Sequence, residues 1–443
     1  MIDLKIIPQK PAVIEGYENE LHALVKINQE ETSNNLETNG VPLNIAIVID
    51  KSGSMAGRPL EEAKRSAAYI IDKMREQDRV AIVAYDDRVD VILPSQKVTD
   101  KIRIKAALEH IRSGGATDLH NGWLTGAEEV ARNKSPNSLN RVLLLSDGNA
   151  NRGEVSPINL QNQCGQLAEE GIITSTYGLG FSFNEELMIS MARSGLGQSY
   201  YGETADDLLD PFQEEFDLLI NTLAWNIRLT AETPSFVKLE LLNKSKAISG
   251  QSNAWHLPDL AEGGDVWALF KLKIKDQNDI SQKIEVLRCN ITYECKIDDQ
   301  IKKQSAGPVK LIIDRVSPAA FNAISEDEEV KRRIDELLFA SLQERARMAA
   351  LEGNWHRVNE ILNESRRIAG SNEWLNESLG ELTKYAFRRQ TDHFSKEAMY
   401  SSEKMRQRLS SNDELASYSY SPSEEFDKKA YLRRKIARGK RMG

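Results

Sequence analysis

The sequence contains few cysteines and histidines, and this scarcity excludes several kinds of site. Its 443 residues include six histidines and three cysteines, Cys164, Cys289 and Cys295. Three unevenly spaced cysteines form neither a disulfide framework nor a zinc motif. Cys289 and Cys295 would share one face of an extended strand, but reduced core thiols are the expected state in a cytoplasmic protein. The histidines are scattered without metal-ligand spacing, so we expect structural roles for them.

The chain also lacks a positive net charge and long apolar runs. Its formal net charge is −9, with 28% charged and 40% hydrophobic residues, a composition typical of soluble globular proteins. Because an acidic chain repels phosphates, we expect no nucleic-acid partner. No run approaches the roughly 20 apolar residues of a membrane span, and the amino terminus lacks the features of a signal peptide. These absences predict a cytoplasmic protein without a membrane span.

The most informative stretch is N-I-A-I-V-I-D-K-S-G-S-M, residues 44–55. Its unbroken apolar run is typical of a strand buried on both faces of a parallel sheet. Asp50, Ser52 and Ser54 follow at the carboxyl end of that strand, where open α/β sheets bind ligands. Carboxylate and hydroxyl oxygens suit Mg²⁺. The alternative is that Asp50 only ends the strand, while Ser52 or Ser54 caps a helix beginning near Pro59.

Two later stretches add further oxygen atoms. The first, S-G-G-A-T-D-L-H-N-G, places Thr117 after a glycine pair, at the start of a predicted helix that ends near Arg132. Thr117 is alternatively the N-cap of that helix. The second, R-V-L-L-L-S-D-G-N-A, is another buried apolar strand that ends in an acid, Asp147. Parallel strands present their carboxyl ends at one edge, so these side chains are expected to lie together.

In order and residue type, the three stretches resemble the metal-ion-dependent adhesion site of a von Willebrand factor type A (VWA) domain. The five motif positions are filled by Asp50, Ser52, Ser54, Thr117 and Asp147. The resemblance implies that the two serines coordinate the metal directly, the threonine directly or through water, and the aspartates mostly indirectly. Mg²⁺ is the expected cation, although such oxygens also accept Mn²⁺ and Ca²⁺. Neutral ligands leave the cation with charge and an open position, which a carboxylate of a protein partner completes.

Residue patterns divide the chain into five regions. Residues 1–40 hold two short strands, expected to pair with strands elsewhere. Residues 41–224 alternate strand and helix, which predicts a doubly wound, mostly parallel α/β sheet. Residues 225–317 alternate apolar and polar side chains, as in an antiparallel β-sandwich. The VWA domain is then inserted in a sandwich, an arrangement similar to bacterial and animal proteins of the inter-α-trypsin-inhibitor group. The pattern of residues 318–410 predicts a helical hairpin or bundle whose third helix extends from Trp374 to about Leu409, and residues 411–443 are expected to form a flexible basic tail.

Two segments prompt hypotheses about regulation. An amphipathic helix predicted near residues 205–223 closes the VWA domain, and in VWA domains that switch, ligand engagement is coupled to movement of the final helix. The tail carries alternate serines that phosphorylation would make acidic beside the basic end. These serines are Ser417, Ser419, Ser421 and Ser423. A loose, solvated terminus is the simpler interpretation of the tail.

Catalytic motifs are absent from the chain. There is no phosphate-binding G-K-[ST] loop, no G-x-S-x-G elbow and no H-E-x-x-H. An aspartyl-phosphate phosphatase would need a second acid two residues after Asp50, where this chain has Ser52. A triad of Ser54, His120 and Asp147 is disfavoured, because His120 falls within a predicted helix. We therefore expect no enzyme, and a hydrolase is the weakest alternative.

The sequence thus predicts a non-catalytic interaction module that holds Mg²⁺ and captures a glutamate or aspartate side chain of a protein partner. The sandwich would act as a frame and the helical end as a second docking surface. Bacterial proteins of this kind resemble scaffolds that work beside kinases, phosphatases or AAA ATPases. The alternative is a structural scaffold whose C-terminal helices bind the partner, while the metal only stabilises loops.

Overall fold

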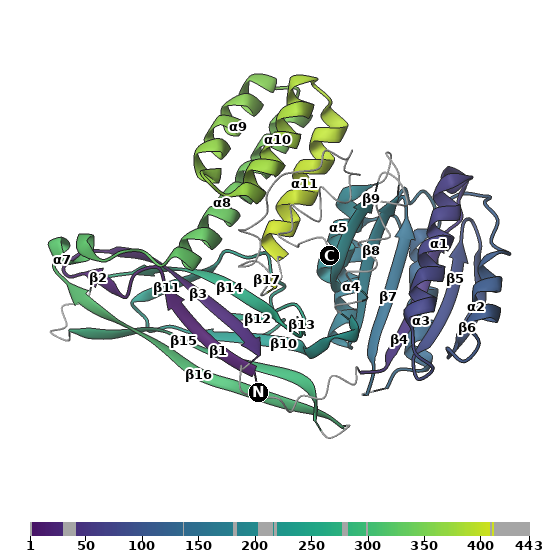
Figure 1. The fold of residues 1–443 in the computed structure, drawn as a ribbon, viewed down its shortest axis with the longest axis horizontal. Coiled ribbons are helices and arrows are strands. Elements are labelled where there is room, and N and C mark those ends of the chain that lie inside the picture. Colours follow the sequence, from purple (N-terminus) through teal and green to yellow (C-terminus); the bar gives the residue numbers. More distant parts are fainter. Residues whose placement is uncertain are drawn as a thin grey trace, which may run out of the picture.

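The computed structural model shows an α/β domain, a β-sandwich and a helical bundle (Figure 1). It describes residues 2–29, 41–135, 137–179, 184–202, 216, 219–276, 282–297, 300–407 and 410–411. In Figure 1 the α/β domain lies to the right, the sandwich to the lower left and the bundle above. The predicted fold class, an α/β domain inserted in a sandwich and followed by helices, is confirmed.

The α/β domain is built on a six-stranded sheet with the spatial order β6-β5-β4-β7-β8-β9. The strands are β4 (Leu43–Asp50), β5 (Arg79–Tyr85), β6 (Val89–Lys97), β7 (Leu139–Ser146), β8 (Ile172–Leu179) and β9 (Leu196–Gly202). Strand β4 pairs in parallel with β5 and β7, whereas β6 pairs antiparallel with β5 at the edge of the sheet. Every residue of β4 and β7 is buried, as expected for central strands covered on both faces.

Helices cover both faces of this sheet. They are α1 (Arg58–Lys73), α2 (Lys101–Leu108), α3 (Leu119–Arg132), α4 (Pro157–Glu169) and α5 (Glu185–Ser194), with a short 3₁₀ helix, η1 (Gly53–Met55). Helices α1 and α2 share a core with one face, and α3, α4 and α5 with the other. Gly126 lets α3 approach the sheet closely, because a Cβ there would lie 2.3 Å from Cγ2 of Val48.

The sandwich consists of two sheets whose inner faces share one core. One sheet contains β1 (Ile2–Pro8), β3 (Asn19–Gln29), β14 (Gly264–Ile274), β11 (Val237–Leu241) and β17 (Ser410–Ser411). The other contains β12 (Ala254–His256), β13 (Leu260–Ala261), β10 (Thr222–Glu232), β15 (Lys283–Ile297), β16 (Gln300–Val316) and β2 (Ala12–Ile14). Along the chain, β3 of the first sheet precedes the α/β domain and β10 of the second sheet follows it.

The carboxyl-terminal part forms a bundle around its own core. Its helices are α8 (Glu328–Leu351), α9 (Trp355–Ala369), α10 (Glu373–Phe387) and α11 (Thr391–Gln407). The short helix α7 (Pro318–Ala323) precedes them and lies beside β2 at the end of the sandwich (Figure 1). The sequence predicts a single helix from Trp374 to about Leu409, and this prediction is wrong. A turn containing Arg389, with a φ of 52°, separates α10 from α11, so Leu382 and Phe394 reach the same core.

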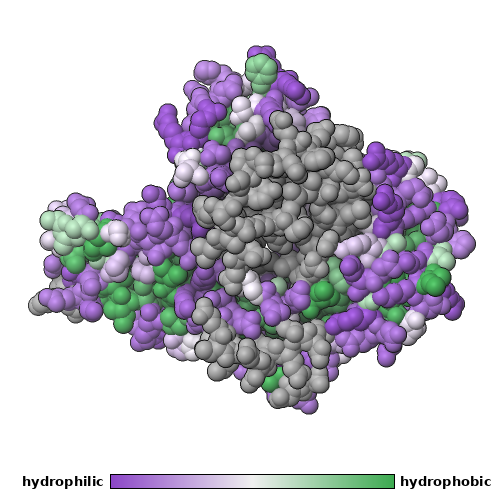
Figure 2. All heavy atoms as spheres, in the orientation of Figure 1, coloured by the Kyte–Doolittle hydropathy of each residue, from purple (hydrophilic) through white to green (hydrophobic). Residues whose placement is uncertain are grey.

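The bundle contacts both other parts. Val330 and Leu337 of α8 pack on Trp267 and Leu269, on the outer face of the first sandwich sheet. On α11, Tyr400 joins the core beside α5 and meets the ring of Tyr201 edge-on, with 6.4 Å between centroids. Figure 2 shows a mainly hydrophilic surface over the bundle, with hydrophobic side chains gathered over parts of the sandwich.

The boundary after the α/β domain differs from the sequence prediction. Strand β10 begins at Thr222, so the predicted helix near residues 205–223 cannot extend to Leu223. Residues 203–215 and 217–218 of that segment lie outside the described residues, as does the tail from residue 412 onward. Within the described ranges, no helix combines the length and the hydrophobicity that crossing a membrane requires.

Candidate metal-binding site

Asp50 ends β4 as a buried carboxylate at the carboxyl edge of the sheet. Its Oδ1 accepts the backbone N–H of Ser52 at 2.8 Å, and its Oδ2 accepts the hydroxyls of Ser146 at 2.6 Å and Tyr85 at 3.3 Å. Burial raises the pKa of Asp50 to about 6, with a smaller contribution from the charge of Asp147, while the hydrogen bonds oppose the shift. Asp50 and Asp147 are thus close enough to repel each other.

The two serines follow at once. The hydroxyls of Ser52 and Ser54 lie 3.1 Å apart, and Ser52 is buried whereas Ser54 is exposed. Ser52 precedes η1 without a side-chain capping bond, and the N-cap of α1 is Gly57. The capping alternative considered for these serines is therefore wrong, and their hydroxyls are not engaged by helix ends.

The loop that carries Thr117 is hydrogen-bonded to the serine loop. The backbone N–H of Gly53 donates to the carbonyl of Gly115 at 3.1 Å, and that of Gly114 donates to the carbonyl of Lys51 at 2.8 Å. The N-cap of α3 is Asp118, whose side chain accepts a backbone N–H of the first helical turn. Thr117 is buried but does not cap the helix, so that alternative is also wrong.

The third loop, which begins at Asp147, is joined to the second. Asn151 accepts the backbone N–H of Thr117 through its Oδ1 at 2.8 Å and donates its own N–H to the Thr117 carbonyl at 3.1 Å. Oδ1 of Asp147 accepts the backbone N–H of Asn149 at 3.1 Å. Gly148 has a φ of 67°, and a Cβ there would lie 2.9 Å from Cγ of Met188, so the turn after Asp147 requires glycine.

The structure therefore brings the three predicted loops together at one edge of the sheet. Among the residues it describes, no group of three or more His, Cys, Asp or Glu side chains is arranged to hold a metal. A cation at this edge would depend on hydroxyl oxygens as well as carboxylates, a donor set suited to hard dications. His120 instead pairs its Nε2 with Oε1 of Gln163 at 2.7 Å, which argues against the triad considered above.

Sequence reasoning missed three residues that shape the site. Ser146 and Tyr85 bind the carboxylate of Asp50, and Asn151 fixes the backbone of Thr117. Ser146 ends β7 and Tyr85 ends β5, the two strands beside β4. Parallel pairing of these strands with β4 therefore indicated that both side chains would lie near Asp50. Asn151 occupies a loop, where no periodicity points to a partner.

Comparison with known families identifies the domain built on this sheet. Residues 44–214 match the family model "von Willebrand factor type A domain". This part of the chain is a VWA domain. The sequence-based recognition is thus confirmed for the domain.

The VWA-containing chain is similar to several proteins in sequence. An uncharacterized protein of Synechocystis is 29% identical over 216 residues, which is 48% of this chain and 50% of that protein. An inter-alpha-trypsin inhibitor heavy chain of Rattus norvegicus is 28% identical over 216 residues, 46% of this chain and 24% of that protein. The chain thus spans half or less of the length of these curated relatives.

Two solved structures resemble this chain over a larger part of its length than the sequence relatives do. A von Willebrand factor type A protein from Catenulispora acidiphila has a TM-score of 0.68 at 15% identity, covering 86% of this chain and 89% of that one. An ArnB paralog from Sulfolobus acidocaldarius has a TM-score of 0.60 at 17% identity, with coverages of 90% and 99%. Because both alignments extend far beyond the VWA domain, the fold they share includes more than this domain. VWA domains commonly act as metal-dependent protein-interaction modules.

Proposed function

We propose that this protein is a non-catalytic interaction module that holds Mg²⁺ at the VWA loops and binds an acidic side chain of a protein partner. The residues proposed to hold the ion are Asp50, Ser52, Ser54, Thr117 and Asp147. The observation that carries the proposal is the hydrogen bonding of three loops around hydroxyls that cap no helix.

The chemistry of these side chains supports capture of a carboxylate. The hydroxyl groups of Ser52, Ser54 and Thr117 are neutral metal ligands, so they would not cancel the charge of a bound dication. A bound Mg²⁺ would supply positive charge and an open coordination position. Ser54 is exposed beside the buried Ser52, which leaves an approach from solvent. The pKa of the buried Asp50 is raised, and the positive charge of a bound Mg²⁺ would compensate the negative charge of its carboxylate.

The direct test is Mg²⁺ binding to a variant with both serines changed, Ser52→Ala and Ser54→Ala. These hydroxyls bond to each other, so the fold should persist while Mg²⁺ affinity falls by about ten-fold or more. Isothermal titration calorimetry gives the affinity, with exposed Ser235→Ala of the sandwich as control. Absence of Mg²⁺ binding to the unmodified protein at millimolar concentration would contradict the proposal.

The partner is tested by co-purification from the native host with and without a chelator. We propose a cytoplasmic protein partner with an exposed glutamate or aspartate, and kinase, phosphatase or AAA ATPase systems are the first to search. A nucleic acid is not proposed, because the chain carries a net charge of −9. Recovery of the partner should require Mg²⁺ and both serines.

The scaffold alternative is favoured by apolar side chains on the bundle surface. Leu338, Met348 and Leu351 of α8 are about half exposed, and Phe387 at the end of α10 is 89% exposed. Such side chains often mark protein contacts when they cluster. If Mg²⁺ binds but partner recovery is unaffected by the chelator, the bundle would be the binding surface and the metal would serve the loops.

A further inference from the structure

A recess lies where the VWA domain, the sandwich and the bundle meet. Its lining comes from the end of α5 and the start of β9, from the segment after β11, from β12 and β14, and from the end of α11. It has a cavity volume of about 50 Å³ and is partly open to solvent. Among the residues that the structure describes, no aspartate or glutamate lines it, although the chain as a whole has a net charge of −9.

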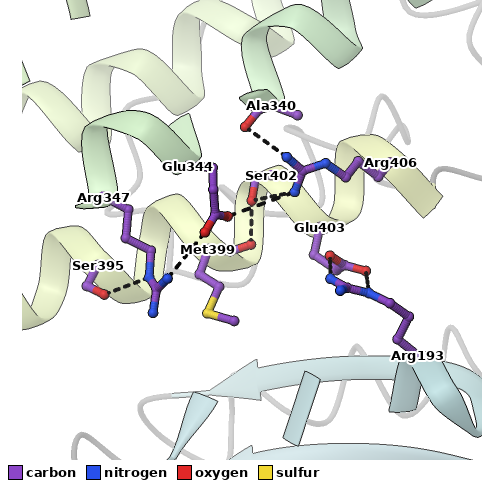
Figure 3. Close-up of polar contacts among 9 residues, drawn as sticks. All are labelled: Arg193, Ala340, Glu344, Arg347, Ser395, Met399, Ser402, Glu403 and Arg406. Atoms are coloured by element: carbon purple, nitrogen blue, oxygen red, sulfur yellow. Dashed lines mark hydrogen bonds and ion pairs between the residues drawn. The ribbon is translucent and has the colours of Figure 1, made fainter. Parts of the chain in front are cut away.

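Four cationic side chains from all three parts line this recess. They are Arg193 of the VWA domain, Lys244 and Lys246 of the sandwich, and Arg406 of the bundle. Figure 3 shows Arg193 and Arg406 with the side chains that hold them. Arg193, Lys246 and Arg406 each lie within 4.0 Å of a glutamate, namely Glu403, Glu169 and Glu344, so among the described residues Lys244 is the cation of this set without a carboxylate partner.

Three of these cations have partners outside the lining. Nε of Arg193 donates to Oε1 of Glu403 at 3.0 Å (Figure 3), and Nη2 of Arg406 donates to the carbonyl of Ala340 at 3.4 Å. Nζ of Lys246 donates to the carbonyl of Gly165 at 2.8 Å. These contacts fix the direction of each side chain and leave further N–H groups for a ligand.

Lys244 differs from the other three. Within the described ranges it forms no hydrogen bond and no ion pair. Burial and the charges of Arg406 and Arg193 lower the pKa of Lys244, while Glu403 and Glu344 oppose the shift. An anion bound beside Lys244 would offset the repulsion from its positive neighbours and so stabilise the charged form of its ammonium group.

His256 adds an unpartnered polar atom to the same lining. The residue is only 4% exposed, and its Nδ1 has no hydrogen-bond partner among the described residues. Burial, followed by the charges of Arg228 and Lys246, lowers the pKa of His256 to about 4. The ring is therefore neutral at pH 7, with one N–H to donate, and a buried ring nitrogen without a partner is costly.

We propose that this recess binds a small phosphate-bearing anion, with Lys244 and His256 as direct ligands and Arg193 and Arg406 beside them. A phosphate monoester carries nearly two negative charges and three acceptor oxygens at pH 7. Guanidinium groups match such oxygens with paired N–H donors. The anion would contact all three parts of the molecule and strengthen their assembly.

The test is calorimetric titration of the full chain with inorganic phosphate and with pyrophosphate, in a chelator so that no dication contributes. We expect binding at millimolar concentration or below, and Lys244→Gln should weaken it by about ten-fold, as loss of a charged hydrogen bond implies. Lys238→Gln, an exposed lysine on β11, should bind as the unmodified protein does. Absence of binding, or equal binding by Lys244→Gln, would overturn the proposal.

A second measurement locates the anion and tests its class. Hydrogen exchange with pyrophosphate present should slow in residues 243–246 and at the end of α11, whose side chains line the recess. Protection confined to other segments would contradict the location. Citrate carries similar charge on carboxylates, so equally tight binding of citrate would overturn the assignment to phosphate.

Discussion

His256 shows at the residue scale how burial controls protonation in this molecule. It ends β12 with its ring almost fully enclosed, and two nearby cations add to the effect of burial. Its pKa of about 4 lies below the ordinary value of 6.5. Between these values the unfolded chain takes up a proton that the folded chain does not, so the free energy of unfolding falls with decreasing pH.

We predict that the His256 contribution is complete above about pH 6.5 and is lost as the pH falls toward 4. The loss amounts to about 2 to 3 kcal/mol. His256→Gln should therefore reduce the decline in stability over this range, as measured by urea unfolding at a series of pH values. His356→Gln is the control, because the His356 side chain is 90% exposed. An unchanged pH profile in the His256 variant would contradict the explanation.

Single residues at the metal edge were only partly predictable. The acids at the carboxyl ends of two buried strands, Asp50 as the last residue of β4 and Asp147 directly after β7, followed from apolar runs of strand length. The cap of α3 did not, since Thr117 and Asp118 both suit an N-cap and only the backbone geometry selects Asp118. Asn151 was missed because its contact with Thr117 spans 34 residues between two irregular loops.

At the scale of elements, the position of α3 depends on its glycines. A Cβ at Gly126 would meet Val48 of β4, and one at Gly122 would lie 2.3 Å from Cγ of Tyr85 in β5. The ring of Tyr85 carries the hydroxyl that bonds to Asp50. Close packing of this helix therefore supports the loops at the carboxyl edge.

We predict that Gly126→Ala lowers the free energy of unfolding by about 1 to 3 kcal/mol, because the added methyl group overfills the contact with Val48. Urea unfolding measures the change. Gly380→Ala in α10 is the matched control: nothing lies within 4 Å of its added Cβ, so a gain of about 0.5 to 1 kcal/mol is expected from helix propensity. A neutral Gly126→Ala would show that α3 can move outward at no cost.

Elements were predictable where periodicity extends over enough residues. The alternating strand β15 and the buried strands β4 and β7 have strong patterns. Strand β2 has only three residues, which is too short for any alternation. The break between α10 and α11 was missed because it contains neither glycine nor proline, the usual signals for a helix end.

At the scale of the whole molecule, α5 and α11 join the VWA domain to the bundle. Asn184 caps α5 and donates its N–H to the carbonyl of Asp147 at 2.9 Å, while Arg193 near the other end of α5 binds Glu403. One helix thus contacts both a candidate metal loop and the bundle. The Arg193 contact spans 210 residues of sequence, so no local pattern predicts it.

We predict that Glu403→Gln weakens the contact between these parts, because the buried Glu403 side chain neutralises Arg193. Hydrogen exchange in α11 should accelerate, and the free energy of unfolding should fall by about 1 to 3 kcal/mol. Glu381→Gln, which affects the ion pair with Lys384 in α10, is the control and should leave exchange in α11 unchanged. Equal exchange in both variants would mean that α11 is held by its apolar contacts alone.

The VWA domain is inserted between two strands of the sandwich. Strands β3 and β10 belong to opposite sheets, so an entire domain occupies the place of an ordinary crossover. Since the entropy of closing a connection increases only with the logarithm of its length, a folded insert between neighbouring ends adds little cost. A short linker in place of residues 41–219 should therefore leave a sandwich that still closes.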